Sequence, residues 1–151
     1  MPASTRARRA LLIVLALVVG WWGVDASRRS HRETLVLATT TCPFRGEPII
    51  TISSDVVPID SAPVLAHEEV HAEQCRSLGP WRYRWENLSG SGKLQLEAPA
   101  YCAGAAVRLR MGQDSARVRV RLIENVYEAL GGLADSATIL RSLQAACPTV
   151  R

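Results

Sequence analysis

Two of the three histidines in the chain lie four residues apart, in the run His67-Glu68-Glu69-Val70-His71. If this run is helical, both imidazoles project from one face, one turn apart, and can bind the same metal ion. Glu68 lies beside the first histidine, where its carboxylate can take a proton from a water molecule on the metal. Because Zn²⁺ lowers the pKa of such a water to about 7, the run predicts a hydrolytic zinc site. The competing interpretation is a solvated helix face on which these side chains only pair with neighbours.

A catalytic zinc site needs a third protein ligand and leaves a fourth position open for water. Glu97 is the best candidate, because a chain reversal before the next predicted helix would return its carboxylate to the histidines. Glu86, in a predicted loop, is the second candidate, and Asp60 and His31 are weaker. Glu73 points off the histidine face. The alternative for Glu97 is a charged residue in the first turn of a helix, where it favours the helix dipole.

Two segments resemble the gluzincin pattern, in which two helix histidines and a glutamate from a later helix bind zinc. His-Glu-Glu-Val-His-Ala-Glu-Gln (67–74) and Leu-Glu-Ala-Pro-Ala-Tyr (96–101) are similar to segments of small metallopeptidase-like domains called minigluzincins. The similarity covers about residues 48–111. It implies a zincin-like metallopeptidase fold, and a peptide substrate that lies along the strand at 48–53.

The resemblance also implies a role for each residue of the motif. His67, His71 and Glu97 would be the metal ligands, and Glu68 the base. One position departs from the pattern, since zincins usually have an uncharged residue where Glu69 stands; an acid is compatible there if it faces solvent or an arginine. Tyr101, one turn beyond Glu97, could donate a hydrogen bond to the developing oxyanion. The alternative for Tyr101 is a half-buried packing role.

The metal motif requires a helix, and the surrounding residues delimit one at 64–78. Asp60 or Ser61 can cap it, Pro63 suits its first turn, and Gly79-Pro80 ends it. Three further helices are predicted at 96–111, 115–130 and 136–146, although 118–122 also alternates like a strand. Pro99 places the start of the second helix nearby, because proline is tolerated in a first turn.

The segments before the metal motif predict a β-hairpin. Residues 34–41 and 48–53 are rich in β-branched side chains, and turn residues separate them. The predicted fold class is therefore α+β, with a short hairpin or small sheet followed by a mainly helical, zincin-like metal-site domain at 34–151.

Residues 1–27 predict an export segment, either a cleaved signal peptide or a retained signal anchor. Three arginines precede an apolar run from Ala10 to Val24, and small residues follow it. This run is longer than the apolar region of a typical signal peptide and shorter than the ~20 residues of a spanning helix. Trp21 and Trp22 favour an anchor, because tryptophan collects at membrane interfaces. We expect a protein that is membrane-anchored and faces the extracytoplasmic side, or is secreted or periplasmic if cleaved; residues 28–33 would be a linker.

The four cysteines all follow the export segment, and their even number predicts two disulfides: Cys42, Cys75, Cys102 and Cys147. If zinc draws the two metal-site helices together, Cys75–Cys102 is the natural bridge and Cys42–Cys147 the other. A Cys42–Cys75 bridge would argue against that helix pair. Spacing alone leaves three connectivities open.

The run Trp81-Arg82-Tyr83-Arg84-Trp85 alternates aromatic and basic residues. It could rest on a bilayer surface or stack nucleobases. The favoured interpretation is that the aromatics cover the metal-site helices while the arginines extend into water. Export and a net charge of only +4 argue against a nucleic-acid partner.

The predicted function is zinc-dependent hydrolysis of peptide bonds outside the cytoplasm, with a peptide or protein substrate. The alternative is a catalytically inactive zinc-binding, disulfide-stapled structural or interaction module at the membrane. A third interpretation is an exported, disulfide-stapled domain without a metal.

Overall fold

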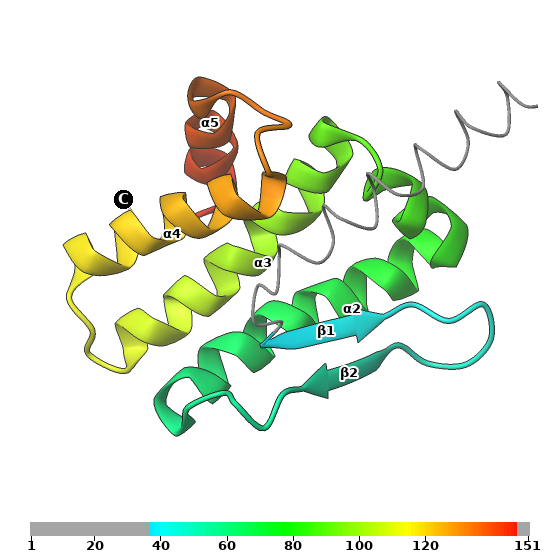
Figure 1. Ribbon diagram of the computed structural model, residues 1–151, viewed down its shortest axis with the longest axis horizontal. Helices are drawn as coiled ribbons and strands as arrows, with labels where there is room; N and C mark the ends of the chain where they lie inside the picture. The colour runs from blue at the N-terminus through cyan, green and yellow to red at the C-terminus, as the bar shows by residue number, and fades with distance from the viewer. Residues whose placement is uncertain (1–36, 148–151) are drawn as a thin grey trace, which may run out of the picture. The chain divides into compact units, whose positions relative to one another are not determined.

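A two-stranded antiparallel hairpin leads into four helices in the computed structural model, which describes residues 37–147 (Figure 1). Strands β1 (Ala38–Thr41) and β2 (Ile49–Ile52) pair with Ala38 opposite Ile52. The helices are α2 (Pro58–Glu86), α3 (Gly90–Arg110), α4 (Ser115–Leu130) and α5 (Ser136–Ala146). These elements confirm the predicted α+β class and the predicted order of hairpin and helices.

Helix α3 is central, with α2 on one side and α4 and α5 on the other, while the hairpin lies along α2 (Figure 1). Gly104 permits the close approach of α3 to α2. A Cβ atom at this position would lie 2.9 Å from the carbonyl oxygen of Pro63. The α2–α3 pair therefore sits close enough for short side chains to meet across it.

Helix α2 is longer than predicted at both ends. It begins at Pro58 after Val57, which makes no side-chain cap, so Asp60 and Ser61 lie inside the first turn. Gly79, with φ 73° and ψ 162°, interrupts the helix without ending it. Glycine adopts this conformation at little cost, and the fixed φ of Pro80 suits the restart of the helix. The segment after the kink is helical through Glu86, which was predicted to lie in a loop.

Helix α3 begins at Gly90, earlier than the predicted start at 96. The hydroxyl of Ser89 caps it by accepting a hydrogen bond from the backbone N–H of Gly92 at 3.0 Å. Pro99 therefore lies in the helix interior, where it removes one backbone hydrogen bond. Buried side chains continue on both sides of it, including Leu96 and Ala100, and this packing outweighs the local preference of proline for a helix start.

Helices α4 and α5 have the predicted bounds. Asp114 and Asp135 cap them, each accepting a hydrogen bond from a backbone N–H at 2.9 Å. The strand-like alternation at 118–122 is helical in the structure. The buried residues of α4 recur every four positions, as one face of a helix requires, and they pack with α3 and α5: Val118, Leu122, Val126 and Leu130.

The predicted disulfide pairing is wrong, although the number of bridges is right. Cys42 joins Cys75, and Cys102 joins Cys147, rather than Cys75–Cys102 and Cys42–Cys147. Cys75 lies in a small core cluster with Cys42, Tyr83 and Leu96, whereas Cys102 belongs to the larger cluster formed by α3, α4 and α5. The helix pair forms all the same, because the Cys42–Cys75 bridge ties the hairpin to α2 and does not separate α2 from α3.

The predicted export segment at 1–27 and linker at 28–33 lie outside the described residues. Between residues 37 and 147, no helix is long and apolar enough to cross a membrane. The two disulfides fit an oxidising compartment, because such bridges are rare in the cytosol.

Candidate metal centre

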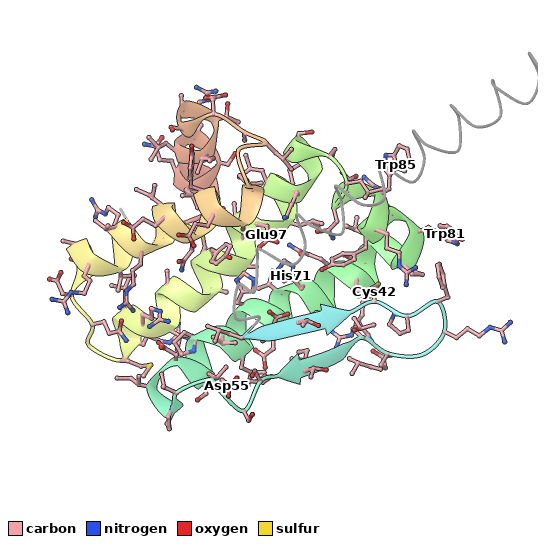
Figure 2. The ribbon with its side chains drawn as sticks, in the orientation of Figure 1. Cys42, Asp55, His71, Trp81, Trp85 and Glu97 are labelled. Atoms are coloured by element: carbon pink, nitrogen blue, oxygen red, sulfur yellow. A yellow bond between two sulfur atoms is a disulfide. The ribbon has the colours of Figure 1, made fainter. Side chains whose placement is uncertain are left out.

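Helices α2 and α3 bring His67, His71 and Glu97 together. The two histidines lie one turn apart on α2, and their Nε2 atoms are 3.0 Å from each other. Glu97 faces them from α3, with its Oε2 atom 3.7 Å from Nε2 of His67 and 3.6 Å from Nε2 of His71. Figure 2 shows the labelled His71 and Glu97 close together between the two helices.

These three ligand atoms have the spacing that one small cation requires. A triangle with sides of 3.0, 3.6 and 3.7 Å has a point about 2.0 Å from all three corners. Zinc binds histidine nitrogen and carboxylate oxygen at about 2.0–2.2 Å. The group can therefore bind a metal ion without rearrangement of the helices.

The competing glutamates and aspartate are engaged elsewhere, in ion pairs with arginines. Glu86 lies 3.5 Å from Arg82, Asp60 lies 2.6 Å from Arg108, and Glu73 lies 3.0 Å from Arg76: each carboxylate is held away from the histidines. His31 lies outside the described residues. Of the candidate third ligands, Glu97 is the one that the structure brings to the histidines.

The protonation of two of the three ligands, His67 and Glu97, suits a cation. Burial, together with the nearby charge of His71, lowers the pKa of His67 to about 4, so this ring is neutral and its lone pair is available. Burial alone would lower the pKa of His71, but the hydrogen bond and charge of Glu97 outweigh it and raise that pKa. In turn, the hydrogen bond and charge of His71 outweigh burial and lower the pKa of Glu97, so the Glu97 carboxylate is ionised.

Gln74 fixes the orientation of the His71 ring. Its Oε1 atom lies 2.9 Å from Nδ1 of His71, and its Nε2 atom donates to the carbonyl of Leu96 at 2.9 Å. With the amide so oriented, Nδ1 of His71 donates to Oε1 of Gln74, and in the neutral ring Nε2 would be the atom left to bind a metal ion. Because Leu96 adjoins Glu97, this amide links ligands on two helices. Sequence reasoning missed Gln74, although its place three residues after His71 puts it on the same helix face.

We expect Gln74→Ala to weaken zinc binding by about 10–100-fold, the usual effect of removing such a supporting partner, without abolishing it. Competition with a fluorescent zinc chelator would measure the dissociation constant. Ser77→Ala is the matched control, since Ser77 lies one turn further along α2 and its exposed hydroxyl donates to the Gln74 carbonyl at 3.1 Å. Equal affinity in the Gln74→Ala and unmodified chains would contradict the role.

Glu68 is buried, with 6% of its surface exposed, and β1 holds it in place. The Thr40 hydroxyl lies 2.6 Å from Oε2 of Glu68 and 3.0 Å from its backbone carbonyl oxygen. Among residues 37–147, the other carboxylate oxygen of Glu68 has no hydrogen-bond partner. Glu69 is exposed, so the acid that departs from the zincin pattern faces solvent. No feature of the local sequence identifies Thr40, because it comes from a separate element.

Two tyrosines border the histidines. The Tyr101 ring lies 4.4 Å from that of His67, edge-on, and burial and the charge of Glu97 raise its pKa. Its hydroxyl therefore stays protonated at neutral pH and can donate. Tyr83, which was not singled out from its run, is buried, and its ring lies 6.3 Å from that of His71.

Of the three aromatic residues in the run 81–85 that were predicted to cover the metal-site helices, Tyr83 is the one that does so. Trp81 and Trp85 are 76% and 73% exposed and extend away from the site. The arginines between them face solvent, as expected.

A scan against protein-family models and searches of curated proteins and of solved structures find no match for this chain, so the geometry of His67, His71 and Glu97 carries the case for a metal centre.

Proposed function

We propose that this chain is a zinc-dependent peptidase that acts outside the cytoplasm. The observation that carries the proposal is the triangle of His67, His71 and Glu97, whose ligand atoms share a point about 2.0 Å away. Two imidazoles and one carboxylate suit zinc, and three protein ligands are typical of catalytic rather than structural zinc sites. The two disulfides and the export segment expected from the sequence support a location beyond the cytoplasm.

The surrounding residues supply the other parts of a hydrolytic reaction. Zinc bound at the triangle would polarise a peptide carbonyl and lower the pKa of a water molecule. Glu68, anchored at one oxygen by Thr40, would accept a proton from water and pass it to the leaving amine. The Tyr101 hydroxyl, which is protonated at neutral pH, donates a hydrogen bond to the oxyanion.

A peptide substrate would lie along β1. The resemblance placed it on the strand at 48–53, but Thr40 of β1 is the residue that contacts Glu68, so we assign the role to β1. Ser53 donates its N–H to the carbonyl of Leu37 at 2.8 Å. By the alternation of antiparallel ladders, the polar backbone groups of Thr40 then point away from β2. This edge of β1 pairs with no other described strand and can accept an added one.

One observation favours the alternative, a zinc-binding module without catalysis. The ligand side chains of His67, His71 and Glu97 are only 16%, 9% and 13% exposed, so a substrate has little surface to approach. In that case zinc would brace the α2–α3 pair and Glu68 would serve only to hold the hairpin through Thr40. Activity measurements at equal zinc content separate the two functions.

Metal analysis of the purified full chain tests the common basis of both functions. We expect about one zinc ion per chain at saturating zinc, as three converging ligands imply, and little in His71→Ala, which leaves only two ligands. Glu73→Ala is the control, because it removes a candidate ligand whose carboxylate instead pairs with Arg76 at 3.0 Å. Clearly less than one zinc in the unmodified chain would refute the metal site.

A further inference from the structure

A solvent-exposed patch of aromatic and basic side chains lies at the end of α2, away from the metal ligands. We call it the aromatic–basic patch; its members are Phe44, Arg45, Trp81, Arg82, Arg84 and Trp85. Trp81, Trp85 and Phe44 are 76%, 73% and 51% exposed. Figure 2 shows both labelled tryptophans extending outward from the last turns of α2.

The members of the patch are held in one arrangement. The rings of Phe44 and Trp81 lie 4.8 Å apart, although Phe44 comes from the hairpin loop and Trp81 from α2. The guanidinium of Arg84 sits 4.2 Å above the Phe44 ring and donates to the carbonyl of Cys42 at 3.3 Å. The Cys42–Cys75 disulfide fixes this loop to the helix. Exposed rings that are organised in this way are unlike the single apolar residues scattered over most surfaces.

The patch carries excess positive charge. Of the three arginines in the patch, Arg82 is the one that forms an ion pair within residues 37–147, with Glu86 at 3.5 Å. Arg45 and Arg84 have no carboxylate within salt-bridge distance in that part of the chain. Aromatic rings with arginines beside them are the combination that suits the headgroup region of a bilayer, with rings at the interface and guanidinium groups on phosphates.

The export segment expected from the sequence would, if retained, hold the chain at a bilayer. The apolar run that ends at Val24 is twelve residues short of Leu37, where the described domain begins. Twelve residues reach at most about 40 Å, so a retained run would keep the domain close to the membrane surface. Tethering makes even a weak contact effective, because its effective concentration reaches the millimolar range.

We infer that the aromatic–basic patch docks this domain on the surface of a membrane that contains anionic lipids. The two tryptophans and Phe44 enter the interface, and the arginines contact lipid phosphates. This surface does not depend on zinc or on catalysis, so it stands apart from the proposed peptidase activity. A second protein with an acidic, apolar surface is the competing occupant.

Tryptophan fluorescence of the full chain in vesicles tests the inference. Trp21→Phe and Trp22→Phe leave Trp81 and Trp85 as the reporters. The chain is reconstituted in phosphatidylcholine vesicles, with and without phosphatidylglycerol, made from ordinary or brominated acyl chains. We expect bromine to quench the emission in the anionic vesicles and high salt to reduce that quenching.

Charge variants identify the surface responsible. Changing Arg45, Arg82 and Arg84 together to Gln should shift docking roughly a hundredfold toward the undocked state, at about 1 kcal/mol for each arginine. The same residues changed to Lys should retain docking, which separates lost charge from lost folding. Arg117, Arg119 and Arg121, exposed on α4, changed to Gln form the matched control and should leave quenching intact.

Two outcomes would overturn the inference. One is equal emission in ordinary and brominated anionic vesicles. The other is a blue shift that grows with protein concentration without bromine quenching, which would identify a protein surface as the occupant.

Discussion

A chain in which Glu68 is replaced by glutamine should keep its zinc and lose most of its activity. We expect kcat on a peptide substrate to fall by about 10²–10⁴-fold, the usual contribution of a positioned base. Glutamine has the same shape and can still accept the 2.6 Å hydrogen bond from Thr40, but it cannot accept a proton from water. Cleavage of a fluorogenic peptide library, with zinc content measured on the same samples, would give the effect.

Glu69→Gln provides the matched control for this experiment. It makes the same chemical change one residue along, at a side chain that faces solvent. It should leave kcat unchanged. Equal activity in Glu68→Gln and the unmodified chain, at equal zinc, would remove Glu68 as the base. Absence of cleavage in both chains, with zinc bound, would favour the non-catalytic zinc module.

Removing zinc should destabilise the domain strongly, because an ion bound by the proposed ligands would join α2 to α3 in the folded chain alone. With zinc at a thousand times its dissociation constant, binding adds about 4 kcal/mol to the free energy of unfolding. Urea unfolding of the oxidised chain, with zinc or with a chelator, would measure the difference. Glu97→Gln should abolish most of the response, since it removes the charged ligand contributed by α3. A response of equal size in Glu97→Gln would show that the stabilisation arises at another site.

The local features of the sequence predicted the parts of the fold that depend on neighbouring residues. Helices α4 and α5 begin where Asp114 and Asp135 cap them, and turn residues define the hairpin. The spacing of His67 and His71 on a helix likewise fixes their shared face. Glu97 followed from the need for a third ligand and a chain reversal, and the structure places it there.

The features that were missed depend on packing between distant segments. Pro99 signalled a helix start, but burial of the surrounding residues carries α3 through it. Gly79 and Pro80 signalled a helix end, yet the chain only bends and continues. The cysteine pairing depends on the hairpin lying against α2, which no local pattern specifies.

Supporting contacts are missed for the same reason. Gln74 matters because the carbonyl of Leu96 happens to lie opposite it, and Thr40 because β1 crosses beside Glu68. Neither relation is visible in one stretch of chain. A metal site is therefore easier to predict from its ligands than from the residues that orient them.

Thr40 lies on β1, outside the α2–α3 pair. Mutations can therefore change the positioning of Glu68 separately from the metal-binding group. All three candidate metal ligands and Gln74 belong to one continuous helical hairpin, whereas the group that contacts Glu68 comes from β1, which the Cys42–Cys75 bridge ties to α2. In the proposed peptidase, sequence drift in the β-hairpin would thus alter reactivity while leaving the metal ligands intact. Divergent copies of this domain would be expected to lose turnover before they lose zinc.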